Sequence, residues 1–335
     1  MEERNIIGHK EFSLKKFFFQ WEWMLVLILL VIHIINANLS PYYLNLKQLV
    51  SATATFMDKS FVVLPMTFAI LLGDNDISIA SNIALSSVIM AVTYNLGVPM
   101  QAAVIICLVV STLCGLFNGF LITRFKELSA VIITLATSII YRGIAYIILE
   151  DQAAGGFPSW YSFLGWGELG GIPFMLIAFA VFAVFFALLL HKTTFGRRVY
   201  AIGNNATASR FSGVQVDKIK IIIFTMVGFM CGITALFLTS RMGSTRPNVA
   251  LGYELDIIAT VVLGGISTAG GKGRIGGPIL AIFVIGYLRY GLGLINVPSQ
   301  VLLIVIGLLL VAAVLTSNIR MDVKKVGSST SDVKQ

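Results

Sequence analysis

Residues 173–191 read PFMLIAFAVFAVFFALLLH, and no acidic or basic side chain interrupts the stretch from Pro173 to Leu190. A helix needs roughly 20 mainly apolar residues to cross about 30 Å of hydrocarbon. This stretch therefore predicts a membrane-spanning helix, and the rest of the chain can be divided by the same criterion.

The chain as a whole has the composition of a protein that is surrounded by lipid. Of its 335 residues, 57% are hydrophobic and 12% are charged, whereas a soluble domain has about 25% charged residues. We therefore expect an all-α integral membrane protein with about ten transmembrane helices. The expected spans are 17–36, 48–72, 77–95, 99–122, 130–149, 173–191, 220–240, 253–268, 277–296 and 299–317.

Two of these spans are weaker than the others. The span 48–72 contains Asp58 and Lys59, and the span 253–268 is short and runs into glycines. The first span follows basic residues, as a signal peptide would, but no small-residue cleavage pattern comes after it. We therefore expect an uncleaved first span that begins near Phe17.

Lysines and arginines are distributed unevenly between the segments that join the spans. If the N-terminus lies inside, 18 of the 24 fall in cytoplasmic segments and three (Lys47, Arg241 and Arg246) fall in external ones. Because cytoplasmic loops carry such an excess, both termini are predicted to be cytoplasmic. The chain then divides into an N-terminal tail (1–16), a transmembrane domain (17–317) and a C-terminal tail (318–335). Basic residues spread in this way argue against nucleic acid as a partner.

The sequence shows no pattern of a catalytic or metal site. The three cysteines lie within apolar runs, and the three histidines are scattered without metal-ligand spacing. No span presents an H-E-x-x-H motif, a carboxylate pair or a nucleophile beside a base, so a membrane-embedded enzyme is not expected. The nearest approach to G-x-x-x-x-G-K-[ST] is Gly271-Lys272, but Ile266 and Gly273 break that phosphate-binding pattern. We expect no metal, no cofactor and no ATP hydrolysis in this chain.

The longest polar stretch between spans, residues 191–220, contains six basic side chains. Asn204 or Asn205 can cap the N-terminus of a short helix over Ala206–Ser212, and Gly213 can end it in the left-handed conformation. A short cytoplasmic helix across the mouth of a bundle would be a docking element for another subunit. A solvated basic loop is the alternative, and spacing alone does not separate the two.

Four stretches, in order along the chain, carry a family resemblance. Residues 196–214, G-R-R-V-Y-A-I-G-N-N-x-x-A-S-R-x-S-G-V, closely resemble the coupling loop of permease subunits in ribose-type ABC importers. The other matching stretches are PMTFAI (65–70) with DISIAS (76–81), LFNG (116–119) with ITLAT (133–137) and YRG (141–143), and GYELDIIA (252–259) with VLGG (262–265) and GGKG (270–273). The sequence departs from the family pattern at Ser209, at Pro65, at Asp74-Asn75 and at Asp58-Lys59.

The resemblance implies a permease subunit of the bacterial inner membrane that imports a monosaccharide or a sugar-like solute. Its implied partners are ABC ATPase subunits, which use ATP and Mg, a periplasmic or lipid-anchored sugar-binding protein, a second copy of this or a similar permease, and membrane lipid. The implied ATPase-coupling residues are Gly196, Arg197, Gly203, Asn204, Ala206, Ala208, Arg210 and Gly213.

Polar groups in or beside the spans are the candidates for the translocation pathway or its gate, because such groups are costly at membrane depth. Arg142 would face the pathway, or would pair with a carbonyl or an acid such as Glu150. Asp76 would cap a helix or take part in gating, and Asn118 would contact sugar hydroxyls or another helix. The full candidate set is Asp76, Asn118, Thr134, Tyr141, Arg142 and Glu254.

A proton- or sodium-coupled secondary transporter is the alternative function. Such proteins place their coupling acids near the bilayer midplane. Only Asp58 qualifies here, and it lies beside the neutralising Lys59.

Overall fold

A computed structural model describes residues 21–298, 301, 304–305, 307–308 and 311. The two expected terminal tails lie outside the described residues, and so does most of the expected span 299–317. Everything below refers to the described residues.

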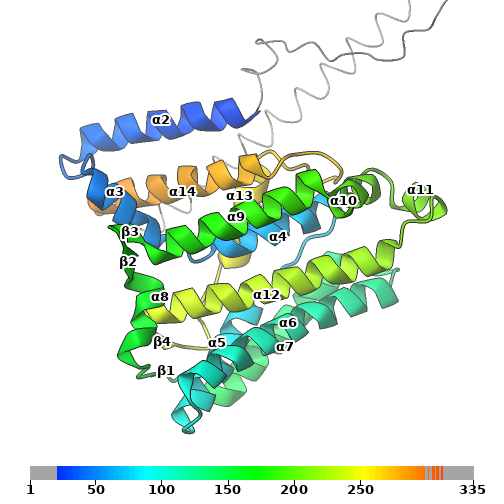
Figure 1. The fold of residues 1–335 in the computed structure, drawn as a ribbon, viewed down its shortest axis with the longest axis horizontal. Coiled ribbons are helices and arrows are strands. Elements are labelled where there is room, and N and C mark those ends of the chain that lie inside the picture. Colours follow the sequence, from blue (N-terminus) through cyan, green and yellow to red (C-terminus); the bar gives the residue numbers. More distant parts are fainter. Residues whose placement is uncertain (1–20, 299–300, 302–303, 306, 309–310, 312–335) are drawn as a thin grey trace, which may run out of the picture.

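Long helices lie side by side and give the molecule its layered appearance (Figure 1). Six of them are long and apolar enough to cross a membrane. These six are α2 (Trp21–Leu39), α6 (Met100–Arg124), α7 (Ala130–Leu149), α9 (Phe174–Lys192), α12 (Val216–Met242) and α14 (Gly276–Leu294). They confirm the helical class and six of the expected spans, with ends that differ from the prediction by a few residues.

The two ends of the bundle differ in structure (Figure 1). At the strand end lie four two-residue strands, a 3-10 turn η2 (Ser159–Tyr161) and α8 (Ser162–Trp166). There β1 (Ala154–Gly155) pairs antiparallel with β4 (Ser244–Thr245), and β2 (Glu168–Leu169) pairs antiparallel with β3 (Ile172–Pro173). The opposite end carries α10 (Thr194–Asn204) and α11 (Ala206–Phe211), and we call it the α11 end.

The span expected over 48–72 is broken. It consists of α3 (Leu46–Ala52), a 3-10 turn η1 (Thr53–Thr55) and α4 (Ser60–Leu71), with a bend of 62° at the break. Asp58 and Lys59 occupy this break, so the charged pair lies between two helices and not within one. Every residue of α4 is buried, which places this half-helix inside the bundle.

The expected span 253–268 is not a full span. Its helix, α13 (Tyr253–Leu263), has 11 residues, about 16 Å of length, or roughly half the hydrocarbon thickness. Residues 246–252, which precede α13, are not helical. The remaining apolar helix, α5 (Ile79–Asn95), has 17 residues and is largely buried beside α6, α7 and α12.

Glycines permit a close contact between the backbones of α6 and α12. A Cβ atom on Gly115 would lie 2.4 Å from the Phe224 carbonyl oxygen, and one on Gly228 would lie 2.5 Å from the Ser111 carbonyl oxygen. Small residues permit such backbone approach between helices in lipid. The α6–α12 pair is therefore closely packed; α5 packs against both helices, and α4 packs against α12.

Candidate functional site

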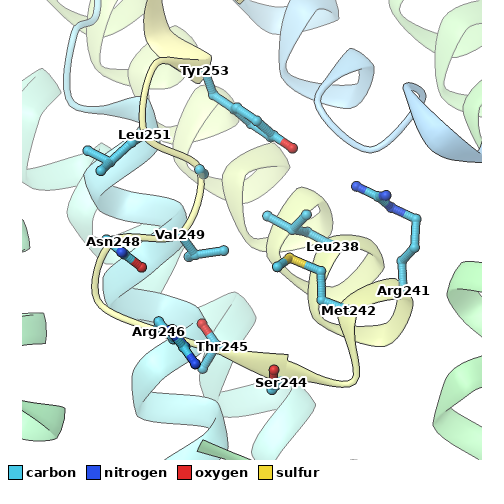
Figure 2. Close-up of a pocket in the computed structure, with 11 residues that line it drawn as sticks. Leu238, Arg241, Met242, Ser244, Thr245, Arg246, Asn248, Val249, Leu251 and Tyr253 are labelled. Carbon is cyan, nitrogen blue, oxygen red and sulfur yellow. The ribbon is translucent and has the colours of Figure 1, made fainter. Parts of the chain in front are cut away.

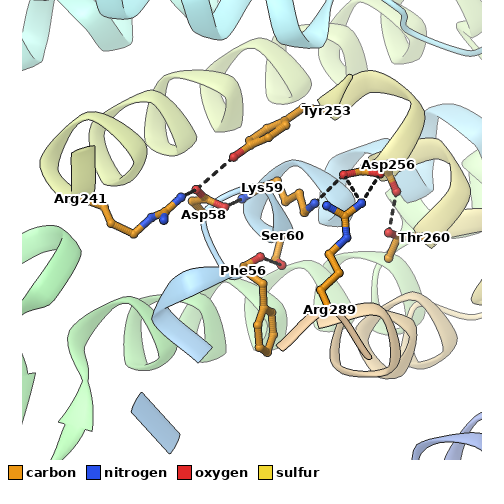
Figure 3. Close-up of polar contacts among 9 residues, drawn as sticks. All are labelled: Phe56, Asp58, Lys59, Ser60, Arg241, Tyr253, Asp256, Thr260 and Arg289. Atoms are coloured by element: carbon orange, nitrogen blue, oxygen red, sulfur yellow. Dashed lines mark hydrogen bonds and ion pairs between the residues drawn. The ribbon is translucent and has the colours of Figure 1, made fainter. Parts of the chain in front are cut away.

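The breaks before α4 and α13 meet in a cluster of charged side chains (Figure 3). The Asp58 carboxylate is 1% exposed and lies 2.6 Å from a guanidinium nitrogen of Arg241 at the end of α12. The Tyr253 hydroxyl donates a 3.2 Å hydrogen bond to the same carboxylate oxygen. Asp58 thus joins the beginning of α4 to α12 and to the beginning of α13.

A second carboxylate, Asp256, completes the cluster from the first turn of α13. It lies 2.5 Å from the Lys59 ammonium and 2.7 Å from the Arg289 guanidinium of α14. Two cations therefore share one acid, and Lys59 also lies 5.3 Å from the centre of the Tyr253 ring. The structure places Asp58 and Lys59 in the break between η1 and α4. Asp58 pairs there with Arg241 of α12, and Lys59 pairs with Asp256 of α13.

Sequence reasoning missed the roles of Arg241 and Arg289. Arg289 lay inside an expected span, and an ionisable residue at membrane depth is itself a signal. Arg241 carried no such signal, because it was assigned to an external loop.

A pocket of about 450 Å³ opens at the strand end beside Arg241 (Figure 2). It lies between the end of α12, β4 and the non-helical segment 246–252. Its lining mixes hydrogen-bonding side chains with apolar ones. The hydrogen-bonding residues are Arg241, Ser244, Thr245, Arg246, Asn248 and Tyr253, and the apolar residues are Leu238, Met242, Val249, Ala250 and Leu251. None of the six expected pathway residues lines it, so this pocket is a feature that the sequence did not reveal.

Arg142 holds the backbone that forms the wall of this pocket. Its guanidinium donates hydrogen bonds to the carbonyl oxygens of Pro247, at 2.5 Å, and Val249, at 2.8 Å. Non-helical backbone at membrane depth is tolerated where protein groups satisfy it or where it lines a cavity. Of the two roles considered for Arg142, the structure shows the pairing with carbonyls, and one of the two acceptor residues, Val249, lines the pocket.

Glu254 lies in the first turn of α13, next to this wall. One of its carboxylate oxygens is buried and has no hydrogen-bond partner among the described residues. The N-terminus of a helix stabilises such a negative charge.

The other four expected pathway residues come together elsewhere, where α5, α6 and α7 meet. The Asp76 carboxylate accepts hydrogen bonds from the backbone nitrogen and the hydroxyl of Ser78, at 2.8 and 2.7 Å. The Asn118 amide donates to the same hydroxyl at 2.7 Å and accepts from the Tyr141 hydroxyl at 3.0 Å. The Thr134 hydroxyl accepts from the Ile77 nitrogen at 3.1 Å.

All four of these side chains are buried. Of the two roles considered for Asn118, the structure shows bonding between helices. The hydrogen bonds between Asp76 and Ser78 form a turn in the chain. This turn lies just before α5, which begins at Ile79.

The segment 191–220 is more helical than predicted. The helix α11 follows the prediction, because the Asn205 side chain accepts from the Ala208 nitrogen at 2.9 Å and Gly213 has a φ of +81°. In contrast, α10 was expected to be loop. It begins at a Thr193 cap and buries Gly196, Val199 and Ile202 on one face, so it packs against the bundle although its other face is polar.

The residues that the resemblance implied for ATPase coupling include exposed and buried ones. Arg197, Ala206, Ala208 and Arg210 are exposed, and Arg210 pairs with the exposed Asp217 at 2.7 Å. Gly196 is buried in the first turn of α10, where a Cβ atom would lie 1.8 Å from the Leu190 carbonyl oxygen of α9. Phe211, which sequence reasoning passed over, is 90% exposed at the end of α11.

The buried side of α10 contacts the glycine-rich segment that follows α13. Here the Tyr200 hydroxyl donates a 2.7 Å hydrogen bond to the Gly273 carbonyl oxygen. Burial raises the pKa of the Tyr200 phenol, and nearby Arg274 opposes this only in part, so the hydroxyl remains a donor at neutral pH. Within the described residues, no group of three or more His, Cys, Asp or Glu side chains could hold a metal ion.

Comparison with known proteins gives consistent matches along most of the chain. Residues 48–314 match a family model described as the permease component of the branched-chain amino acid transport system. The ribose import permease protein RbsC of Bacillus subtilis is 37% identical over 289 residues, which cover 86% of this chain and 89% of that protein. The autoinducer 2 import system permease protein LsrD of Klebsiella pneumoniae is 34% identical over 301 residues, covering 88% and 90%. No solved structure matched the chain.

Proposed function

Because the chain belongs to the family of ABC-transporter permeases that serve branched-chain amino acids and sugars, we propose that it forms the translocation pathway of a bacterial inner-membrane importer for a monosaccharide or sugar-like solute. As a member of that family it is a multi-pass membrane subunit without catalytic activity of its own. ATP hydrolysis belongs to separate subunits.

The pocket at the strand end is the main structural support for a sugar-like solute. A sugar presents hydroxyls on its edges and C–H groups on its faces, so it needs hydrogen-bonding and apolar walls together. Arg246 and Asn248 on one side, with Met242 and Leu251 nearby, supply this mixture in about 450 Å³. Ligand sites of 300–1,000 Å³ with few polar groups are typical for small molecules.

The names of the relatives point to the same class. RbsC is named for ribose and LsrD for autoinducer 2, and we propose a solute of similar size and polarity here. A binding protein would deliver it to the strand end, and both chain termini would lie at the opposite, cytoplasmic side.

The α11 end supports docking of an ATPase. Its exposed face presents the small side chains Ala206 and Ala208 and the aromatic Phe211, and aromatic residues exposed in this way are frequent anchors of protein interfaces. A second permease copy would place two such faces side by side, one for each ATPase subunit.

The secondary-transporter alternative loses its main candidate residue. Asp58 is the acid that ion coupling would require, and Arg241 and Tyr253 already engage its carboxylate. A proton or sodium ion would have to displace a buried ion pair to bind there.

Uptake by the assembled transporter tests the solute class. The chain would be reconstituted with the ATPase and binding protein that co-purify with it in mild detergent, and the uptake of radiolabelled ribose, other pentoses and hexoses, autoinducer 2 and leucine would be measured. We expect ATP-driven uptake of one of the sugar-like solutes and none of leucine. Uptake of leucine alone would contradict the proposed solute class.

A further inference from the structure

At the α11 end of the bundle, the end of α4 is joined to the segment that follows α13. Leu71 is the last residue of α4, and Gly271 lies in the glycine-rich segment after α13. The Gly271 nitrogen donates a 2.8 Å hydrogen bond to the Leu71 carbonyl oxygen. This bond links the end of α4 to a segment about 200 residues later in the sequence.

The backbone of α10 packs directly against this joint. A Cβ atom on Gly203 would lie 1.9 Å from the Leu71 carbonyl oxygen and 2.5 Å from the Gly271 nitrogen. Only a residue without a side chain fits there, because the obstructing atoms belong to backbone. Gly203 is therefore in contact with the end of α4 and with the segment after α13 at once.

Side-chain hydrogen bonds hold α10 in this place. Besides the bond from Tyr200 to the Gly273 carbonyl oxygen, the Asn204 amide donates to the Gly271 carbonyl oxygen at 3.5 Å. A single residue, Asn205, then separates α10 from α11. The exposed α11 thus lies one residue from an element that touches α4 and the segment following α13.

The half-helices are also joined at their other ends. There Lys59 pairs with Asp256, and Tyr253 donates to Asp58. The two helices α4 and α13 pack against each other. Because they are linked directly at these ends, and at the α11 end through the segment after α13, we expect a displacement at one end to move the pair as a unit. The charged cluster at the far end borders the pocket through Arg241 and Tyr253.

We propose that Gly203 is a positioning residue through which α10 transmits a displacement of α11 to α4 and α13 together, and so to the wall of the pocket at the strand end. The proposal rests on the proposed function, in which an ATPase acts on α11. Packed contacts of this kind have discrete arrangements and can carry such a displacement.

A fluorescent probe in the pocket tests this transmission without knowledge of the solute. Asn248 is exposed and lines the pocket, and the native cysteines are buried, so Asn248→Cys can be labelled selectively. In the complex with the ATPase, we expect binding of a non-hydrolysable ATP analogue to change the probe's emission. Gly203→Ala should reduce that change at least ten-fold while the amount of co-purifying ATPase stays the same.

Gly276→Ala is the matched control, because a Cβ atom at this glycine would meet nothing within 4 Å. It should retain the full change in emission. An unaltered change in Gly203→Ala, or no change in the otherwise unmodified complex, would overturn the proposal. A lack of sugar uptake would instead contradict the proposed function and leave the emission measurement valid.

If the Gly203→Ala protein does not insert into the membrane, a second variant, Tyr200→Phe, tests the same proposal. Tyr200→Phe removes the hydrogen bond to Gly273 without adding bulk, and one ordinary hydrogen bond shifts an equilibrium by about five-fold. We expect a reduction of this size in the ATP-dependent emission change. An emission change equal to that of the parent complex would overturn the proposal in this variant too.

Discussion

A guanidinium nitrogen of Arg142 and the carbonyl oxygen of Val249 lie 2.8 Å apart. This contact joins the middle of a membrane-spanning helix, α7, to the non-helical segment that precedes α13. It explains how backbone without helical hydrogen bonds is accommodated beside a pocket, and it makes Arg142 responsible for the shape of that pocket.

Replacement of Arg142 should therefore disturb both stability and transport. Arg142→Met leaves the carbonyl oxygens of Pro247 and Val249 without their charged donor, and a hydrogen bond to a charged group contributes about 1.5–3 kcal/mol. We expect a lower melting temperature in detergent and a strong loss of uptake. Arg246→Met is the control, since Arg246 is exposed and has no ion-pair partner among the described residues; it should change stability by less than about 0.5 kcal/mol. Equal effects of the two variants on stability would contradict this role.

Breaking the Asp58–Arg241 pair should cost more than removing it altogether. Asp58→Ala leaves the Arg241 charge partly buried without its partner, which typically costs about 3–5 kcal/mol. The double variant Asp58→Ala/Arg241→Met removes both charges and should recover part of this loss. The free energy of unfolding of the two single variants and the double variant gives the coupling. Strictly additive losses would mean that the pair does not stabilise the break before α4.

The short helix α11 should tolerate loss of charge better than added bulk. Ala208 is exposed between Ala206 and Phe211, so Ala208→Trp should abolish ATPase co-purification by steric clash while protein abundance stays near normal. Arg210→Ala removes an exposed ion pair with Asp217, typically worth about 1 kcal/mol or less, and should weaken docking only slightly. If the segment is a basic loop without a docking role, Arg210→Ala should have the larger effect and Ala208→Trp the smaller one. Normal co-purification and uptake with Ala208→Trp would show that α11 is not the coupling element.

Topology can be tested at the two ends of the bundle. The excess of basic residues predicts that the α11 end is cytoplasmic, so Asn205→Cys should react with an impermeant thiol reagent only after the cells are opened. Asn248→Cys at the strand end should react in sealed cells. External labelling at residue 205 would reverse the orientation.

Hydrophobicity revealed the long helices but could not reveal the half-helices. Uninterrupted apolar runs such as 174–190 must be helical in lipid, because each backbone group needs a partner within its own segment. The breaks before α4 and α13 depend on contacts such as Asp58 with Arg241, which are 183 residues apart. No local pattern reports such a contact, so 253–268 was wrongly expected to cross the membrane.

The candidate site was predictable only in part, because its contacts also join residues that are far apart in the sequence. The family motifs brought Asp76, Asn118, Thr134 and Tyr141 into one set, and the structure places them together, but as a network between helices. Arg241, Asn248 and most of the other pocket residues come from the segment 241–252, which was expected to be an external loop. The close contact of Gly203 with Leu71 is likewise invisible in the sequence, since it depends on how α10 lies against α4.

The source of energy is the most direct test of the whole account. The purified chain would be placed alone in liposomes, and solute accumulation would be measured under an imposed proton or sodium gradient and, separately, with ATP inside. We expect no accumulation and no ATP hydrolysis from the chain alone, and ATP-dependent accumulation once its ATPase and binding protein are added. Gradient-driven accumulation by the chain alone would contradict the account in favour of a secondary transporter.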